Sequence, residues 1–358
     1  MREGRTYTHK RGILHLEKRG GIERAANKQR ARIISAKLQR ELDQFARDVD
    51  AGLGGKPKSL LPHYFYDEEG SQLFERICSL SEYYLTRTEA AILAGQSQEI
   101  IDAVGDEKEV NIVELGSGTS TKTRILFRAL LAQGRKRRLV NYYPIDISHT
   151  ILQDTANMLA DDFPNLRVRE IIGDYESGIE KACALIEKQQ KMIIFLGSSI
   201  GNLEPDATVD FFDKIRGKMN RADMLMVGFD MEKDPKVLES AYNDRSGVTA
   251  KFNLNIMKRI NSQLGGQFDL SSFDHRALYN RTQHRVEMHL VSKKDQSVHI
   301  GALGRAYAFK KGESIHTESS YKYSVKRIES LAEQSGLRVK KHLLDDKKWF
   351  DVCLLYAP

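Results

Sequence analysis

Two glycines and two aspartates follow apolar segments in the middle of the chain, and their types and spacing suit a nucleotide-like ligand. Gly116 and Gly118 stand directly after the apolar segment Val110 to Leu115 and before a helical pattern. Glycine lets the backbone approach a ligand closely, and the helix N-terminus that follows offers free N–H groups. The segment lacks the third glycine of G-x-G-x-x-G and is not a phosphate-binding loop, so a dinucleotide or a nucleoside triphosphate fits poorly. Taken alone, a G-x-G is as consistent with an ordinary tight turn.

The aspartates follow the next two strand-like segments. Asp146 lies 30 positions beyond Gly116, where a carboxylate can accept hydrogen bonds from both hydroxyls of a ribose. Asp174 and Tyr175 come after a third segment and can hold an adenine by its amine and its ring face. A lone aspartate at such a place is more often a helix N-cap. Because these three sites include no cradle for a pyrophosphate, they favour S-adenosyl-L-methionine (SAM) over NAD as the cofactor.

A sheet must bring the ends of these strands together. The chain has the alternating strands and helices that such a sheet needs. Alternation of this kind predicts βαβ units and an α/β fold, with a mostly parallel sheet that helices cover on both faces. The strand-like segments are Val110 to Leu115, Leu139 to Ile145, Val168 to Ile172, Met192 to Leu196 and Met224 to Phe229.

The rest of the chain predicts a second, mixed domain and a return to the sheet. After Asp230 the alternation loosens, and Arg285 to Val291 has the pattern of a half-buried antiparallel strand. Gly336 is expected to end the last helix, and the folded body is expected to begin near Ala36. The other expected elements are helices over Arg30 to Val49, Glu89 to Val104 and Ser324 to Ser335, a loop over Ala51 to Ser59, and terminal strands over Leu337 to His342 and Asp351 to Tyr356.

Length and composition exclude several classes of protein. The chain has 358 residues, of which 41% are hydrophobic and 29% are charged, so a disordered or fibrous chain is excluded and about two domains are expected. Apolar runs such as Met192 to Leu196 are far shorter than the roughly 18 residues that cross a bilayer. The histidines and the three cysteines lack the spacing of a metal site or a disulfide framework. The cysteines are Cys78, Cys183 and Cys353.

The net charge of the chain lies in residues 1–45. This basic extension contains 12 Lys and Arg against 5 Asp and Glu, whereas residues 46–358 contain 44 of each kind. Such an arm could bind nucleic acid or anionic lipid, or it could be a solvated, partly helical extension. The extension has no apolar stretch of a secretory signal, and its acidic Glu3, Glu17 and Glu23 disfavour a transit peptide. The cytoplasm is therefore the expected location.

Five longer segments resemble one specific family, the histidine Nα-methyltransferases that use SAM to make the betaine precursor of ergothioneine. They are LPHYFYDEEGSQLFERICSLSEYYLTRTEAAIL (Leu61 to Leu93), VELGSGTSTKT (Val113 to Thr123), LGSSIGNLEP (Leu196 to Pro205), AYNDRSGVTAKFNLN (Ala241 to Asn255) and IHTESSYKY (Ile315 to Tyr323). The resemblance covers about residues 58 to 358. It implies a Rossmann-like class I SAM-dependent methyltransferase sheet with a second, smaller mixed α+β substrate domain.

The resemblance also implies domain limits and roles for individual residues. A cofactor domain would comprise residues 88–230 and 322–358, and a substrate-binding lid would comprise residues 46–87 and 231–321. The cofactor would be held at its methionyl part by Gly116, Ser117, Gly118 and Lys122, at its ribose by Asp146, and at its adenine by Asp174 and Tyr175. The substrate would be held at its carboxylate by Asn202 and Tyr242, at its amine by the catalytic Tyr66 and Tyr83, and at its imidazole by Glu318 and Ser320, with Met288 packed nearby.

These implied roles agree with the chemistry of free L-histidine. A buried Glu318 can accept one ring N–H while Ser320 serves the other ring nitrogen, so an amino acid without that ring leaves a polar group unpaired. Methyl transfer needs alignment of the amine with the sulfonium and an unprotonated amine, rather than covalent help from the protein. We expect a monomeric enzyme that has a small-molecule substrate, needs no membrane and adds up to three methyl groups, giving the betaine hercynine.

Other interpretations remain at this stage. A related enzyme could methylate a prenylated tryptophan or a histidine-derived thiol, although such an enzyme would be expected to change Glu318 and Ser320. The chain could also be a nucleic-acid-binding, methyltransferase-like module that uses its basic extension. Residue by residue, the tyrosines and Met288 could be ordinary core side chains, Asn202 could close a turn, and Glu318 and Ser320 could be exposed.

Overall fold

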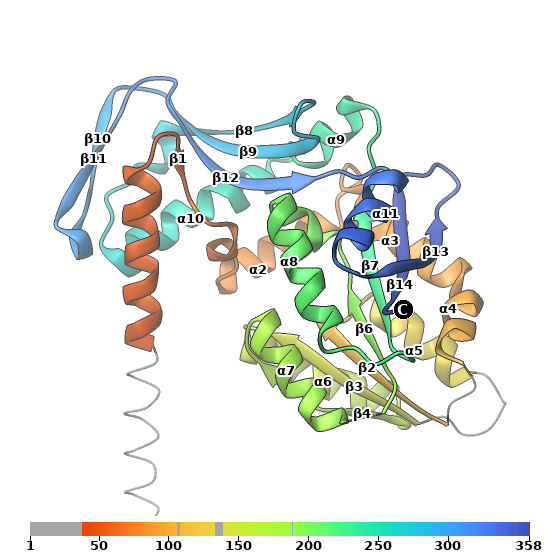
Figure 1. Cartoon of the computed structure of the whole chain (residues 1–358). Helices are drawn as coiled ribbons and strands as arrows, with labels where there is room; N and C mark the ends of the chain where they lie inside the picture. The colour runs from red at the N-terminus through yellow and green to blue at the C-terminus, as the bar shows by residue number, and fades with distance from the viewer. Residues whose placement is uncertain (1–37, 106–107, 133–138, 188) are drawn as a thin grey trace, which may run out of the picture.

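The computed structural model describes residues 38–105, 108–132, 139–187 and 189–358, and its centre is an eight-stranded sheet (Figure 1). The strands follow the order β13-β14-β7-β6-β2-β3-β4, and β5 also pairs with β3. They are β2 (Glu109–Leu115), β3 (Leu139–Asp146), β4 (Leu166–Val168), β5 (Ile171–Ile172), β6 (Lys191–Phe195), β7 (Met224–Asp230), β13 (Arg338–Leu344) and β14 (Phe350–Tyr356).

The order of the strands confirms the predicted α/β fold and places the strand ends that matter side by side. All pairs from β7 to β4 are parallel, and only the terminal β14 and its neighbour β13 introduce antiparallel pairing. Strand β3 lies on one side of β2, and β6 lies on the other. The order of the chain therefore reverses at β2, and a crevice at the carboxyl ends of the strands beside such a switch point is where ligands bind in open α/β sheets.

Successive side chains of the central strands enter two different cores, as expected for a sheet covered on both faces. Ile112 and Ile194 join one core, and Val113 and Ile193 join the other. The first core includes side chains of α3 (Tyr84–Gly95), α4 (Ser97–Val104), α5 (Thr123–Ala132) and α6 (His149–Asp162). The second includes side chains of α7 (Tyr175–Ile186), α8 (Pro205–Arg216) and α11 (Val325–Gln334).

A second, four-stranded sheet lies beside the first and shares its first core. Its order is β1-β12-β9-β8, with β12, β9 and β8 antiparallel to one another. The strands are β1 (Lys58–Ser59), β8 (Phe273–Asn280), β9 (Arg285–Ser292) and β12 (Ser314–Tyr321), and β10 (Gln296–Ile300) and β11 (Arg305–Phe309) form a separate hairpin. The other elements are a helix over residues 38–54, helices α2 (Glu68–Cys78), α9 (Pro235–Ala241) and α10 (Val248–Leu264), and the short η1 (Pro62–Phe65), η2 (Ser199–Asn202), η3 (Leu270–Ser272) and η4 (Gly301–Leu303).

Three of the predicted elements are wrong in detail. The strand expected over Val168 to Ile172 is two short strands, β4 and β5, separated by the exposed Arg169 and Glu170, of which Arg169 N still donates a hydrogen bond to Tyr142 O of β3. The helix expected over Glu89 to Val104 is divided at Gln96 into α3 and α4.

The third correction concerns the loop expected over Ala51 to Ser59. Residues 51–54 continue a helix that spans 38–54, and Lys58 and Ser59 form β1. Leu53 is fully buried, and its packing outweighs the low helix propensity of the glycines beside it. The predicted start of this helix at Arg30 and the start of the folded body near Ala36 lie outside the described residues, as does most of the basic extension.

The end of the chain follows the prediction. Helix α11 begins after the N-cap Ser324, whose hydroxyl accepts a hydrogen bond from Arg327 N. It is followed by Gly336, which has a φ of +69° and is the residue type that this conformation favours. The strands β13 and β14 then return to the main sheet beside β7. Among the described helices, none is both long and apolar enough to cross a membrane.

Candidate active site

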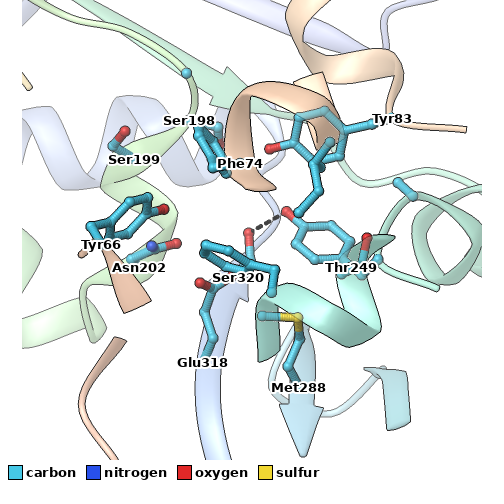
Figure 2. Close-up of a pocket in the computed structure, with 15 residues that line it drawn as sticks. Tyr66, Phe74, Tyr83, Ser198, Ser199, Asn202, Thr249, Met288, Glu318 and Ser320 are labelled. Atoms are coloured by element: carbon cyan, nitrogen blue, oxygen red, sulfur yellow. Dashed lines mark hydrogen bonds between the residues drawn. The ribbon is translucent and has the colours of Figure 1, made fainter. Parts of the chain in front are cut away.

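A pocket is lined by residues of strands β9 and β12, of helices α2, α9 and α10, and of the loop after β6 (Figure 2). Seven residues that the sequence analysis assigned to the substrate line it: Tyr66, Tyr83, Asn202, Tyr242, Met288, Glu318 and Ser320. These residues are up to 254 positions apart in the chain, from Tyr66 to Ser320, and the fold places them around one cavity.

One wall of the pocket is formed by the antiparallel pair of β9 and β12. Glu318 and Ser320 alternate along β12, so both point to the same face of the sheet. Met288 on β9 is the direct register partner of Glu318. Glu318 is only 6% exposed and Ser320 only 3% exposed, so the alternative that they are surface groups is wrong.

Glu318 is a buried acid that lacks a donor. None of the described residues donates a hydrogen bond to its carboxylate, and Figure 2 shows the carboxylate pointing into the cavity. Burial raises the pKa of Glu318 to about 7, against the opposing effect of the positive charge on Lys322. A ligand that brings an N–H to this carboxylate supplies the partner that the protein does not.

Tyr242 and Ser320 form a hydrogen-bonded pair next to Glu318. Their hydroxyl oxygens are 2.8 Å apart, the contact drawn as a dashed line in Figure 2. Tyr242 follows the C-terminus of helix α9, and burial raises the pKa of its phenol, so it is a neutral hydroxyl. The pair therefore offers hydroxyl donors and acceptors to the same cavity as the Glu318 carboxylate.

Asn202 reaches the pocket from the loop that follows β6. It is the last residue of η2, and its neighbour Gly201 packs closely against β12. A Cβ at Gly201 would lie 2.9 Å from Tyr321 O, so only glycine lets this turn sit so near the strand. The alternative that Asn202 merely closes a turn does not explain its place on the pocket wall.

Tyr66 and Tyr83 lie on the aromatic side of the pocket. The ring of Phe74 makes an edge contact with each, at centroid distances of 5.5 Å to Tyr66 and 6.4 Å to Tyr83. Such contacts fix the rings without using their hydroxyls. Burial, with the nearby Glu318 carboxylate, raises the pKa of Tyr66, and burial also raises that of Tyr83, so both keep their protons at neutral pH.

The predicted cofactor residues gather at the carboxyl ends of β2 and β3. Gly116 and Gly118 have φ values of +68° and +49°, which favour glycine, and a Cβ added at Gly118 would meet nothing within 4 Å. Asp146 accepts a hydrogen bond from Gly118 N at 3.0 Å and thereby ties this turn to the end of β3. The phenol oxygen of Tyr175 would lie 3.1 Å from a Cβ at Gly116, so this ring covers the turn.

Asp174 has the structural role that the sequence left open. It is the N-cap of α7 and accepts a hydrogen bond from Ser177 N at 2.8 Å. The carboxylate is exposed, and the hydrogen bond to Ser177 N is the first of the contacts that lower its pKa. This position keeps it next to Tyr175 at the end of β5, so a capping role does not exclude contact with a ligand.

Lys122 and Glu89, which the sequence analysis missed, connect the loop after β2 with the loop after β6. Lys122 forms an ion pair with the fully buried Glu89. Glu89 also accepts a hydrogen bond from Gly197 N at 2.8 Å, in the loop after β6. Glu89 therefore fixes the loop after β2 relative to the loop that carries Asn202.

The residues present fit the cofactor that the sequence predicted. The glycine turn leaves open space at Gly118, the Asp146 carboxylate stands at the end of the neighbouring strand, and the Tyr175 ring covers the turn. This set lacks a cluster of basic side chains for phosphates, and it matches a nucleoside joined to an amino-acid tail better than a dinucleotide.

Other pocket residues were not singled out from the sequence. They are Phe74, Ile77, Gly197, Ser198, Ser199, Ala241, Thr249 and Phe252. All lie inside the segments that resemble the family. The segments as a whole therefore pointed to this pocket, although no single one of these residues did. Ser198 is notable because its φ of +57° is rare outside glycine, and its hydroxyl accepts a hydrogen bond from Asp230 N at 2.9 Å.

One group of potential metal ligands lies elsewhere. His342, Asp351 and Cys353 on β13 and β14 have ligand atoms within 4.8 Å of one another. None of them lines the pocket. His342 Nδ1 and Asp351 Oδ2 are already 2.5 Å apart in a hydrogen bond of their own. This group is therefore not part of the candidate active site.

Comparison with known proteins gives matches over nearly the whole described chain. Residues 45–357 match the family described as "Histidine-specific methyltransferase, SAM-dependent". The histidine N-alpha-methyltransferase of Mycolicibacterium smegmatis is 39% identical over 292 residues, which are 82% of this chain and 88% of that protein. Ergothioneine biosynthesis protein 1 of Neurospora crassa is 31% identical over 310 residues, 85% of this chain but 33% of that longer protein. A solved structure, the CcbJ methyltransferase from Streptomyces caelestis, matches 75% of this chain and 96% of its own with 12% identity and a TM-score of 0.39.

Proposed function

The chain belongs to the family of histidine-specific, SAM-dependent methyltransferases, and on this premise we propose that it methylates the α-amino nitrogen of free L-histidine. The observation that carries the proposal is the Glu318 carboxylate, which is buried on the pocket wall without a donor from the described residues. A buried carboxylate without a partner is costly, and an imidazole N–H removes that cost. The Ser320 hydroxyl, two positions along the strand, then reaches the other ring nitrogen.

The amino-acid part of histidine would be held by other residues of the pocket. Asn202 carries an amide that can donate a hydrogen bond to the α-carboxylate, and the Tyr242 ring, whose hydroxyl shares a hydrogen bond with Ser320, would pack beside the amino-acid part. Tyr66 and Tyr83 would orient the α-amine, since both are neutral phenols on the aromatic side. A neutral phenol can accept a hydrogen bond from the amine and so turn the nitrogen lone pair toward the methyl donor.

The loops after β2, β3 and β5 would hold SAM. Gly116, Ser117, Gly118 and Lys122 would surround its methionyl part, Asp146 its ribose, and Asp174 and Tyr175 its adenine. When bound, SAM supplies a methyl group already activated on a sulfonium sulfur. The contribution of the protein is therefore to align the amine and exclude water, for which the enclosed aromatic wall of Tyr66, Tyr83 and Phe74 is suited.

We propose further that the amine is methylated three times, giving hercynine, and that the enzyme takes part in ergothioneine formation. The amine side of the pocket is lined by aromatic rings, which can accommodate added methyl groups and attract a methylated ammonium. We also propose that residues 46–87 and 231–321 act as a lid over a cofactor domain of residues 88–230 and 322–358.

The proposed setting is a cytoplasmic monomer. Cys78, Cys183 and Cys353 are free thiols, as is usual in a reducing compartment. Light scattering of the purified protein at several concentrations tests the monomer, because a mass that rises to twice the chain mass would contradict it.

The experiment that tests the function is a methyl-transfer assay with SAM and a panel of free amino acids. We expect L-histidine to be methylated and tryptophan to be a poor substrate, because its single ring N–H cannot serve both Glu318 and Ser320. The mass of the product after long incubation gives the number of methyl groups. A product that stops at one methyl group would contradict trimethylation without affecting the choice of substrate.

A further inference from the structure

Behind the pocket wall lies a lysine that none of the proposed contacts to histidine uses. Lys322 directly follows β12, two positions after Ser320, and its side chain is 0% exposed. Its ammonium forms an ion pair with Asp230 Oδ2 at 2.7 Å. It also donates hydrogen bonds to Tyr242 Oη and to Ser320 Oγ, each at 2.9 Å. Lys322 does not line the pocket, but it contacts two residues that do.

Counting donors and acceptors shows what these contacts do to the two hydroxyls. An ammonium has three protons, and the contacts to Asp230, Tyr242 and Ser320 engage all three. Tyr242 and Ser320 therefore both act as acceptors toward Lys322. They also share one hydrogen bond with each other. Each of the two hydroxyls carries one proton. One of these protons forms the hydrogen bond between the hydroxyls, and the other is available to a ligand in the pocket.

Either hydroxyl can donate in the bond between them, and we assign the donation to Tyr242, which leaves the proton of Ser320 for the ligand. A serine oxygen has two lone pairs, which here accept from Lys322 and from the Tyr242 hydroxyl, so its own proton is directed away from both. In this arrangement Ser320 faces the ligand as a donor, whereas Glu318 faces it as an acceptor. One wall then presents an acceptor and a donor, the pair that matches the N–H and the bare nitrogen of a neutral imidazole.

We propose that Lys322 is a positioning residue for substrate recognition, which fixes the Tyr242 and Ser320 hydroxyls so that Ser320 presents a donor beside the Glu318 acceptor. The inference rests on the proposed function, since it concerns how the same pocket recognises a ring with one N–H and one bare nitrogen. Without the ammonium, both hydroxyls regain a free lone pair, and Ser320 can turn between donor and acceptor. Recognition of the ring weakens, although no residue that touches the substrate has changed.

The surroundings of Asp230 make this lysine testable. Asp230 Oδ1 also accepts hydrogen bonds from Tyr84 Oη at 2.6 Å and from Lys233 Nζ at 2.5 Å. Removal of Lys322 therefore leaves Asp230 with a cation and a hydroxyl, so the loss of the ion pair does not leave the carboxylate bare. Lys322→Met keeps the length of the side chain and removes only its charge and its donors.

The chain offers a matched control in a second buried lysine. Lys191 and Asp223 form an ion pair whose side chains are 1% and 0% exposed. Lys191 stands at the start of β6, at the end of that strand opposite the loop that carries Asn202. Asp223 likewise keeps other partners, the backbone N–H groups of Lys191 and Asn220. Lys191→Met therefore loses a comparable pair without touching the pocket.

The test compares the wild type with Lys322→Met and Lys191→Met by calorimetric titration of L-histidine in the presence of S-adenosylhomocysteine, together with steady-state kinetics. We expect Lys322→Met to raise the dissociation constant and the KM for histidine by roughly 5- to 10-fold, no more than the loss of the Ser320 hydroxyl itself, with kcat and the affinity for S-adenosylhomocysteine changed less than about three-fold. We expect Lys191→Met to leave both affinities within about three-fold of the wild type. Equal changes of the dissociation constant for histidine in the two variants would overturn the role of Lys322.

A double-mutant cycle shows whether Lys322 acts through Ser320. If it does, Lys322→Met adds less than about three-fold to the loss already caused by Ser320→Ala, because the hydroxyl that it positions is gone. If the losses of histidine affinity in the two single variants multiply fully in the double variant, Lys322 does not act through Ser320, and this part of the proposal is overturned. Should Lys322→Met fail to fold, Lys322→Gln, which keeps one donor group, is expected to give a smaller loss in the same direction, and an unchanged KM in that variant would overturn the inference.

The two levels of the proposal fail in different ways. If the wild type binds and methylates histidine and Lys322→Met behaves like Lys191→Met, the role of Lys322 is wrong and the proposed function stands. If the wild type does not bind histidine, the proposed function is wrong, and the inference about Lys322 is overturned with it.

Discussion

Glu318 and Ser320 are two positions apart on strand β12, and both side chains are buried against the same pocket. Their neighbours in the strand face the other way. Ser319, for example, contacts His316 Nε2 at 3.1 Å and does not line the pocket. A single strand thus delivers a carboxylate and a hydroxyl to one ligand, and the residue between them offers a control for experiments on both.

Ser320→Ala and Glu318→Gln should each weaken histidine binding. Hydrogen bonds to charged groups contribute about 1.5–3 kcal/mol, so Glu318→Gln should raise the dissociation constant for histidine by roughly 10- to 150-fold. The neutral bond of Ser320 is weaker, and Ser320→Ala should raise it by roughly 2- to 10-fold. Calorimetry with S-adenosylhomocysteine present measures both effects.

The control variants for that prediction change residues on the opposite face of the same sheet. Ser319→Ala and Glu287→Gln, the latter at the register partner of Ser319, should leave histidine affinity unchanged. A loss in these controls as large as in the pocket variants would show a general effect on the sheet rather than recognition of the ring.

The Glu318 carboxylate should also make the stability of the ligand-free protein depend on pH. Its pKa is about 7 in the folded protein, above the usual value of 4.5, so the folded state binds the proton more tightly than the unfolded state. Its contribution to stability is complete below about pH 4.5 and is lost as the pH rises through about 7. At pH 8 the ionised group costs about 3 kcal/mol, by the conversion of about 1.4 kcal/mol per pKa unit.

Glu318→Gln removes this titration, so the variant should be more stable than the wild type by about 3 kcal/mol at pH 8 and by little at pH 5. Urea unfolding of both proteins without ligand at the two pH values measures the difference. The other described buried acids with a raised pKa, Glu114 and Asp351, are common to both proteins and cancel in the comparison. A stability difference that is the same at both pH values would contradict the burial of an unpaired Glu318.

Asp146 should control the affinity for the cofactor. Its carboxylate accepts hydrogen bonds from Gly118 N and Ser148 N, each at 3.0 Å, and is proposed to hold the ribose. Asp146→Asn should weaken the binding of S-adenosylhomocysteine by at least about ten-fold, because the amide replaces an acceptor with a donor. Asp154→Asn, at an exposed site on α6, is the control and should have no effect. Unchanged cofactor binding in Asp146→Asn would rule out the assigned contact.

Tyr66 should influence the number of methyl groups transferred. Tyr66→Phe keeps the edge contact of the ring with Phe74 but removes the hydroxyl that is proposed to orient the amine. We expect kcat to fall by roughly 10- to 100-fold, the range for a lost orienting hydrogen bond, and partly methylated histidine to accumulate. Mass spectrometry of the products over time measures both. A wild-type rate and product pattern would remove Tyr66 from the catalytic role.

The sequence predicted most of the fold because its signals are local. The five strand-like segments of the central sheet and the return of the terminal strands follow from short-range hydrophobic patterns, and the glycines at 116 and 118 mark the turn after β2. Where tertiary packing competes with local propensity, the prediction fails. Leu53 is buried, so the helix continues past glycines that favour a loop. The strand expected after α6 is divided into β4 and β5 at two exposed residues.

The candidate site was predictable only in part for the same reason. Seven of the residues that line it could be named because they stand in long segments that resemble a known family. Lys322 and Glu89 stand in the same segments but could not be named, because their importance comes from partners far away in the chain. Lys322 contacts Asp230, 92 positions earlier, and Glu89 accepts from Gly197, 108 positions later. Composition gives no sign that either charge is fully buried.

The most direct test of the central claim is a titration of free L-histidine into the wild-type protein and into Glu318→Gln, with S-adenosylhomocysteine bound, followed by the methyl-transfer assay on the same samples. The account predicts that the wild type binds histidine and transfers methyl groups to its α-amine, and that Glu318→Gln binds histidine at least ten-fold more weakly while its affinity for S-adenosylhomocysteine is unchanged. Equal histidine affinity in the two proteins, or methylation of another amino acid in preference to histidine by the wild type, would contradict it.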